Sequence, residues 1–407
     1  MKLIDQYRGL RRENYILFFG RIVTSLGGMI WSLLTLILNQ KMGMDAGSIA
    51  ILVSTAGILL LPAGLLGGKL ADRCNKKNII IYADLVSIVC YVLCGLIPLG
   101  TPTIVLILIA SLFQTLEGPA YDALVADITP TKDRERAYSL LYLGVNIGMI
   151  LSPTIGGILL ENHLWLCFII SGVSIGISTF MIWRWVKDIT PVVEESEEAS
   201  YQVAQETESV FRILKKNPLV FLFLTGTALY SAAYMQHSFL MPLDMAAVHE
   251  NGAVIFGTVM SLNCFVVVVF MPLITNWFGR LAEPAKLLIG QMLLAGGYGI
   301  FLLLLGHVPA YYLAMFVFTL GEIFCTLARG PYMTRRVPSS HRGRISGVVG
   351  VMQSVLMGIF NIITGRIYDS AGSAAAWTVV IAVLGIAVLI SLLLIRSDRK
   401  AYPKLYE

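Results

Sequence analysis

The chain has 407 residues, of which 57% are hydrophobic and 14% are charged. Together with a mean hydropathy of +0.76, this composition excludes an ordinary soluble protein, which would have to expose large apolar patches. The net charge of +5 is small. Because most of the bases lie between apolar segments, the charge indicates membrane topology rather than a surface for nucleic acid.

Twelve apolar segments of about 20 residues are each long enough to cross about 30 Å of hydrocarbon as a helix. They lie at about 15–38, 48–70, 78–99, 103–126, 138–160, 164–186, 218–242, 253–277, 286–306, 310–329, 344–366 and 374–395. The first segment is too long for the core of a signal peptide, so we interpret it as the first span. We therefore expect an all-α membrane protein with twelve transmembrane helices.

Basic residues set the expected orientation, because bases near the ends of spans are retained in the cytoplasm. An even number of spans places both termini on one side of the membrane. Of the 30 bases, only Lys41 and Arg366 fall on the opposite side, while Arg21 and Arg329 lie within spans. We expect a multi-pass protein of the cell membrane with both termini in the cytoplasm.

The chain divides near its middle. Residues 188–217 begin with an acidic run and end with bases, which is typical of a flexible cytoplasmic linker. The sequence thus predicts an N-terminal six-helix bundle at 1–187 and a C-terminal six-helix bundle at 218–407. An internal repeat supports this division, because the Gly118-Pro119 pair and the basic turn after it recur at Gly330-Pro331.

A glycine-rich helix end and a charged turn lie between the second and third segments. They read Gly64-Leu-Leu-Gly-Gly68-Lys-Leu-Ala-Asp72-Arg73-Cys-Asn75-Lys76-Lys77. This pattern resembles the signature loop between helices two and three of the major facilitator superfamily of transporters. The resemblance covers almost the whole chain and is to the bacterial twelve-span multidrug:proton antiporters. It implies two pseudo-symmetric bundles, with a substrate cavity lined by helices one, four, seven and ten.

The resemblance also implies that this turn is a conformational latch against helix eleven. The expected members are Gly64, Gly68, Asp72, Arg73, Lys76, Asp127 and Arg344. Small residues four apart let another helix approach closely. Asp72 suits the positive N-terminal end of a facing helix, and Lys76 or Arg73 can pair with Asp127. The alternative is that the turn serves only as a positively charged anchor.

The fifth segment carries a second motif of small residues. It consists of Gly144, Gly148, Ser152, Pro153, Gly156 and Gly157. Residues 144, 148 and 152 share one helical face, and the proline is expected to bend the helix. The set resembles the packing motif of exporters that exchange substrate for protons, with Ser152 in place of a glycine. Tight packing of this kind also occurs in importers.

Ionisable residues at membrane depth are costly and are therefore functional candidates. For proton coupling the candidates are Glu117, Glu322, His237 and Asp84, and for the substrate cavity they are Arg21, Gln114, Tyr230, Tyr234, His237 and Glu322. Glu117 and Glu322 lie on helices expected to line the cavity, and Glu322 is the deeper. Two alternatives remain open. Arg21, Asp84 and Asp122 could form a structural charge network, and His237 could be bonded to backbone. The arginine that related drug exporters carry in helix four is replaced by Ser111.

The sequence contains no nucleotide-binding loop and no catalytic motif. We therefore expect no enzyme, cofactor or metal site, and the expected partners are a small-molecule substrate, protons and the lipid bilayer, with no nucleic acid. We expect a monomeric secondary transporter that exports small amphipathic or cationic organic compounds by proton-coupled alternating access. The alternatives are a proton symporter that imports a sugar, peptide or nucleoside, and a membrane sensor that transports nothing.

Overall fold

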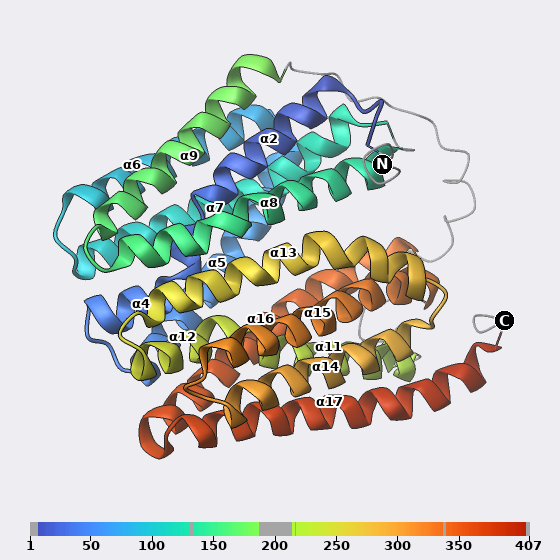
Figure 1. Ribbon diagram of the computed structural model, residues 1–407. Helices are drawn as coiled ribbons and strands as arrows, with labels where there is room; N and C mark the ends of the chain where they lie inside the picture. The colour runs from blue at the N-terminus through green and yellow to red at the C-terminus, as the bar shows by residue number, and fades with distance from the viewer. Residues whose placement is uncertain (1–6, 131–132, 187–213, 216, 337–338, 404–407) are drawn as a thin grey trace. The chain divides into compact units, whose positions relative to one another are not determined.

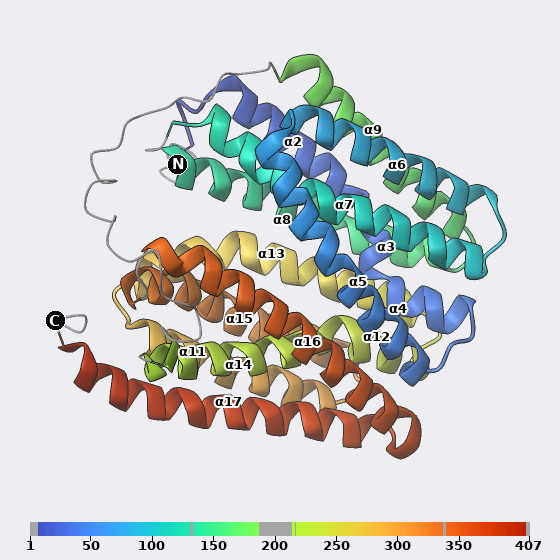
Figure 2. The same cartoon turned by 180° about the vertical axis from the view of Figure 1, so that it is seen from behind.

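The computed structural model describes residues 7–130, 133–186, 214–215, 217–336 and 339–403, without the side chains of residues 72, 134, 135, 334, 339–344 and 346–349. The predicted linker lies outside these residues except at 214–215 and 217. Within the described ranges, every long element is a helix (Figures 1 and 2). The helices are α2 (Arg12–Leu26), α3 (Met29–Ser32), α4 (Leu34–Leu36), α5 (Ala46–Arg73), α6 (Lys76–Leu96), α7 (Thr101–Ile128), α8 (Arg134–Leu160), α9 (Leu164–Trp185), α11 (Pro218–Tyr234), α12 (Gln236–Val248), α13 (Gly252–Phe278), α14 (Glu283–Leu303), α15 (Val308–Arg336), α16 (Ser339–Ala371) and α17 (Ser373–Ala401).

Among the described residues, eleven helical runs are long and apolar enough to span a membrane, with α11 and α12 counted as one run. Each corresponds to a predicted segment. The remaining predicted segment, at 15–38, is divided into α2, α3, α4 and a π-helix at Ile37–Lys41. The sequence thus located this hydrophobic segment but not its internal breaks.

The break after α2 has a local cause. Gly27 and Gly28 follow the last residue of α2, and glycine weakens a helix. The carbonyl oxygen of Gly27 accepts a hydrogen bond from the Ser171 hydroxyl of α9. A Cβ at Gly27 would lie only 2.6 Å from Cβ of Ser174. Gly27 therefore allows α9 to lie directly against the interrupted helix.

The chain forms two compact units. Unit 1 consists of Met1–Met44, Thr55–Glu195 and Met245–Val268, and unit 2 of Asp45–Ser54, Ser196–Asp244 and Val269–Glu407. Three of the divisions fall within helices, so α5, α12 and α13 each contribute one part to each unit.

Helix pairing follows the same order in the two units. In unit 1, α2 packs on α8 and α9, and α6 packs on α7 and α9. In unit 2, α11 packs on α16 and α17, and α14 packs on α15 and α17. These are the first, third, fourth, fifth and sixth predicted spans of each half, paired in the same way. The repeat in the sequence is therefore also a repeat in the packing.

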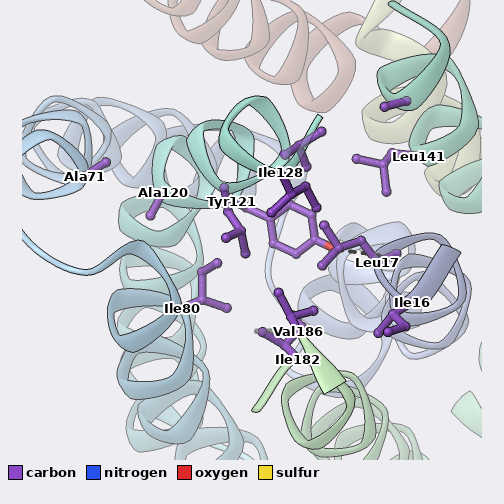
Figure 3. Close-up of a cluster of buried hydrophobic side chains, with 13 residues drawn as sticks. Ile16, Leu17, Ala71, Ile80, Ala120, Tyr121, Ile128, Leu141, Ile182 and Val186 are labelled. Carbon is purple, nitrogen blue, oxygen red and sulfur yellow. Dashed lines mark hydrogen bonds between the residues drawn. The ribbon is translucent and has the colours of Figure 1, made fainter. Parts of the chain in front are cut away.

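Each unit has an apolar core with a tyrosine in it. In unit 1, Tyr121 lies among Leu17, Ile128 and Val186, and its hydroxyl donates to the carbonyl oxygen of Leu17 at 3.3 Å (Figure 3). In unit 2, Tyr332 stacks on Phe223 with 3.7 Å between the ring centroids. Tyrosine suits these positions because its ring fills the core and its hydroxyl satisfies a backbone carbonyl.

A buried charge network joins the ends of α14, α15 and α17. Arg336 donates to both oxygens of Asp398, and its Nη1 lies 3.2 Å from Glu283 Oε2. Arg335 pairs with the same glutamate at 2.7 Å. Burial works against the charged form of Arg336, but the hydrogen bond and the charge of Asp398 outweigh it and raise the pKa of Arg336.

We expect Asp398→Ala to destabilise the protein by about 3–5 kcal/mol, because it leaves the fully buried Arg336 guanidinium without its main partner. Thermal unfolding in detergent measures this loss. The exposed neighbouring variant Arg399→Gln should stay within about 0.5 kcal/mol of the parent. Equal stability of the two variants would show that the network contributes little.

Candidate functional site

Two acidic side chains from neighbouring helices meet inside unit 1. Asp84 of α6 and Glu117 of α7 are 6% and 8% exposed, and each carboxyl group is close enough to the other to affect it electrostatically. Thr179 of α9 donates its hydroxyl to Asp84 Oδ2 at 2.6 Å. Two carboxylates this close in a buried site repel each other, and a proton bound to either one relieves the repulsion. The pair can therefore hold a proton.

A cation lies beside the acid pair. Arg21 of α2 acts electrostatically on both carboxyl groups, and its guanidinium carbon lies 3.6 Å from the ring centroid of Tyr121. The aromatic face holds the guanidinium in place by a cation–π contact. With one proton on the acid pair, the arginine and the two acids carry no net charge, which lowers the cost of burying the group.

The acid pair combines residues that the sequence analysis considered under two interpretations. Arg21 and Asp84 were possible members of a structural charge network with Asp122, while Asp84 and Glu117 were both candidates for proton coupling. The structure brings Arg21 and Asp84 together with Glu117. The Asp122 side chain is exposed and is affected by the charge of Arg21. Gln114 lies on the same helix, and its Nε2 donates to the hydroxyl of Tyr91 at 3.4 Å.

Unit 2 contains a cluster of aromatic side chains around one acid. The Tyr234 hydroxyl at the end of α11 donates to Glu322 Oε1 of α15 at 2.9 Å. Its ring stacks on Phe318 at 5.4 Å between centroids and lies 5.8 Å from the ring of Tyr230. Aromatic faces beside a carboxylate are the chemistry that attracts an organic cation.

His237 has a structural role in the same cluster. It follows the break between α11 and α12, and its Nδ1 lies 2.7 Å from the carbonyl oxygen of Tyr234. The hydroxyl of Tyr298 donates to the same carbonyl oxygen at 3.0 Å. A helix break inside a membrane leaves carbonyl groups that other protein groups must satisfy. His237 thus has the backbone hydrogen bond that the sequence analysis named as its alternative role.

The signature turn is held by contacts on both sides. Gly67 of α5 lies against the backbone of Leu116 in α7, where a Cβ would overlap the Leu116 carbonyl group. Lys76 Nζ lies 2.7 Å from Asp127 Oδ2, so Lys76 rather than Arg73 makes this ion pair. Asn75 caps α6 by accepting a hydrogen bond from the amide of Asn78 at 3.1 Å.

The other members of the predicted latch contribute less to the described contacts. A Cβ at Gly64 would make only ordinary van der Waals contact with Thr115. A Cβ at Gly68 would have no neighbour within 4 Å. The close approach of α5 and α7 is therefore at Gly67. Arg73 is exposed. The side chains of Asp72 and Arg344 lie outside the described residues.

The small residues of the fifth span lie at close helix contacts. In α8, Gly144 and Gly148 face Phe18 and Ile22 of α2, and Gly156 faces Met29. Gly157 lies against the backbone of Ala253 in α13. Two further members, Ser152 and Pro153, are buried between these glycines. The motif thus joins α8 to the first span on one face and to α13 on another.

We expect Gly148→Ala to destabilise the protein by about 1–3 kcal/mol, because the added methyl group would overlap backbone atoms of α2 that cannot move independently. The midpoint of thermal unfolding in detergent tests this. Gly385→Ala in α17 is the matched control, because a Cβ there has no neighbour within 4 Å. A Gly148→Ala variant as stable as this control would contradict the packing argument.

Several residues of these clusters were not singled out from the sequence. Thr179 and Tyr298 are common residue types in membrane helices, and only tertiary contacts show their roles. Asp244 of α12 is 2% exposed and accepts hydrogen bonds from Tyr368 and Trp377. The rule that identified Glu117 did not select it, because the predicted seventh segment ended at residue 242, whereas the helical run continues to Val248.

Comparisons with known proteins agree with this architecture. The family model described as Major Facilitator Superfamily matches residues 17–361. A Na⁺, Li⁺, K⁺/H⁺ antiporter of Planococcus maritimus is 22% identical over 84% of this chain and 86% of its own. The multidrug resistance protein MdtG of Proteus mirabilis is 26% identical over 75% of each chain. A crystal structure of the peptide transporter POT aligns with a TM-score of 0.79 at 16% identity, covering 97% of this chain and 95% of the other.

Proposed function

The chain belongs to the major facilitator superfamily, a family of membrane transporters, and we propose that it is a proton-coupled exporter of small amphipathic or cationic organic compounds. The buried pair of Asp84 and Glu117 beside Arg21 is the observation that carries this proposal. It supplies a place inside the membrane helices where a proton can be held and released.

The charge balance of this group favours exchange of a proton for a cation. With one proton on the acid pair, Arg21, Asp84 and Glu117 together are neutral. When the proton leaves, they carry one uncompensated negative charge, which is costly in a buried site. An incoming monovalent cation compensates that charge. A returning proton neutralises the charge instead, and the cation can then leave. The two species therefore compete, which is the requirement for antiport.

The aromatic cluster of unit 2 supports an organic substrate. Tyr230 and Tyr234 supply aromatic rings, and Glu322, which accepts a hydrogen bond from the Tyr234 hydroxyl, supplies a negative charge beside them. A lipophilic cation can use both features at once. The likeness to a multidrug resistance protein is in keeping with such a substrate.

The remaining parts of the proposal concern the setting. The distribution of bases favours the cell membrane, with both termini in the cytoplasm. We further propose that the monomer is the working unit, since each unit supplies one of the two clusters.

Alkali cations are a second candidate substrate. The carboxyl groups of Asp84 and Glu117 and the hydroxyl of Thr179 are oxygen donors, which are the ligands that hard cations prefer. The similarity to an antiporter of Na⁺, Li⁺ and K⁺ supports alkali cations as substrates. Arg21 beside the same group opposes a bare metal ion, so the organic cation remains the first choice.

Transport by the purified chain in proteoliposomes tests these candidates. A pH gradient of about one unit is worth about 1.36 kcal/mol and can sustain about a tenfold gradient of a monovalent cation exchanged one for one. We expect tetraphenylphosphonium to move against the proton flow. Selective movement of Na⁺ or K⁺ would favour the second candidate. Uptake of a dipeptide or nucleoside with the protons would overturn antiport, and binding without flux would indicate a sensor.

A further inference from the structure

An acidic side chain at the end of α16 caps the beginning of α5. Asp369 Oδ1 accepts a hydrogen bond from the amide of Ala46 at 3.2 Å, and its Oδ2 accepts one from the amide of Gly47 at 2.6 Å. The residues involved all belong to unit 2. The two helices are more than 300 positions apart in the sequence, so this is a tertiary contact and not a local turn.

Asp369 completes the hydrogen bonding of this helix end. The amides of a helix's first turn have no partner within the helix. At α5, Asp45 accepts from the amide and hydroxyl of Ser48 at 2.8 and 2.7 Å, which leaves the amides of Ala46 and Gly47 for Asp369. The negative charge also interacts favourably with the positive end of the helix dipole.

Gly47 is the residue that makes room for the cap. A Cβ at this position would lie 2.9 Å from Asp369 Oδ2 and 3.3 Å from Asp45 Oδ1. Any larger residue would therefore push the Asp369 carboxylate away from the amides that it caps. The glycine is not required by the backbone angles of α5, so the close approach of Asp369 explains its presence.

Below the cap, α5 and α16 pack through small residues. A Cβ at Gly365 would lie 2.9 Å from the carbonyl oxygen of Ala46 and 3.0 Å from Cβ of Ala50. Two turns further along α16, the hydroxyl of Ser54 donates to the carbonyl oxygen of Gly358 at 2.9 Å. This packing ends where α5 passes from unit 2 into unit 1, between Ser54 and Thr55.

The end of α16 that carries Asp369 is fixed by its neighbouring residue. The Tyr368 hydroxyl donates to Asp244 Oδ1 of α12 at 3.0 Å, and Trp377 of α17 donates to Asp244 Oδ2. Asp244 thus joins α12, α16 and α17 next to the cap. These contacts fix the helix end from which the Asp369 carboxylate reaches α5. Asp369 itself remains exposed to solvent.

We propose that Asp369 is a detachable latch that holds the first turn of α5 against α16 in one state of the transport cycle and releases it in the other. The proposal rests on the proposed alternating-access function. The predicted latch at Asp72 lies at the opposite end of α5 and was expected to face the beginning of α16. The same two helices would then have one acidic latch at each end, and each latch would favour closure of its own side.

The two latches differ in one informative way. The Asp72 latch is part of a turn recognisable in the sequence, whereas Asp369 lies in the stretch Arg366-Ile-Tyr368-Asp369-Ser370 that matches no motif of the sequence analysis. Under the orientation proposed above, Ala46 and Asp369 lie on the outer side. Removal of the latch should therefore populate the state that is open to the outside.

The test uses a thiol introduced at Ser54, which is 6% exposed and lies at the end of the packed stretch. In intact cells expressing the full chain, a membrane-impermeant maleimide should label Ser54→Cys slowly. We expect Asp369→Ala to raise the labelling rate roughly two- to thirtyfold, the range that corresponds to the loss of a helix cap. Gly47→Ala should also raise it, because the methyl group displaces the carboxylate without changing any charge.

Two further variants make the result decisive. Ser370→Ala is the matched control, since its hydroxyl bonds only to the carbonyl oxygen of Arg366 in the same helix and it should leave the rate unchanged. Asp369→Asn keeps the shape of the side chain and one acceptor oxygen, so it replaces the alanine variant in the labelling assay if the alanine variant fails to fold. Unchanged labelling in the folded Asp369 and Gly47 variants, or an equal rise in the control, overturns the latch. The assay needs neither substrate nor pH gradient, so its outcome is independent of whether proton coupling is confirmed.

Discussion

Replacement of Glu117 by glutamine is expected to abolish proton-driven transport while substrate exchange without a gradient continues. The amide keeps the size of the side chain and can still donate a hydrogen bond to Asp84, but it cannot release a proton. The site would then be held permanently in a state resembling the protonated one. The measurement is counterflow and pH-driven flux of the same labelled substrate in proteoliposomes. An imposed gradient of about one pH unit should no longer produce the roughly tenfold accumulation that it can sustain for the parent protein.

Companion variants separate this mechanism from general damage. Asp84→Asn removes the second carboxyl group of the pair and should also uncouple flux from the pH gradient. Glu161→Gln is the control, because this acid at the end of α8 is exposed, and it should retain coupling. Glu322→Gln tests the other candidate carboxyl group, which is partly buried and accepts a hydrogen bond from the Tyr234 hydroxyl. Full pH-dependent transport by Glu117→Gln and Asp84→Asn would place the proton elsewhere, with Glu322 as the next candidate.

The preference for Glu117 over Glu322 comes from the structure and reverses the order suggested by the sequence. Depth along a predicted span favoured Glu322, because only the position of each residue in its own helix was visible. Proton binding depends on which groups face each other across helices. Asp84 and Arg21 lie beside Glu117, and no period or spacing in the chain joins residues 21, 84 and 117.

The fold was largely predictable because the properties that determine it can be read along the chain without knowing which segments meet. Segment length and hydropathy located the helices, and the duplicated Gly-Pro pairs at 118 and 330 indicated that the two halves repeat. The breaks after Leu26 and Tyr234 were not predicted, because they depend on partners such as Ser171 and Tyr298 that satisfy the exposed carbonyl groups. A helix break is stable in the membrane only where such partners exist, and these come from distant segments.

Charged residues at helix ends were the least well interpreted. The turn after α13 contains Gly279 and Arg280 but no aspartate, so it does not match the signature turn. In the structure, Glu283 on α14 pairs with Arg335 on α15, and in the other unit Lys76 on α6 pairs with Asp127 on α7. The corresponding helices are thus joined by an ion pair of reversed polarity. A motif search cannot detect this, because the interaction is retained while the residue types are exchanged.

Replacement of Asp72 by asparagine is expected to preserve folding and membrane insertion but to remove most transport, by roughly tenfold or more if the lost charge–dipole interaction is worth about 1.4 kcal/mol. The described contacts explain why the turn should still form. Gly67 against Leu116, the Lys76–Asp127 ion pair and the Asn75 cap hold it from both sides without Asp72. A loss of transport in the folded variant would therefore report on the latch itself.

The alternative interpretation of the turn makes the opposite prediction for a neighbouring residue. If the turn is only a positively charged anchor, loss of a base should matter more than loss of an acid. Lys69→Gln is the appropriate comparison, because Lys69 is exposed on the same helix end. Transport and insertion of both variants should be measured at matched expression. Wild-type transport by Asp72→Asn together with a defect in Lys69→Gln would establish the anchor. The reverse pattern would leave α5 with a functional acid at its end, as the proposed role of Asp369 at its beginning requires.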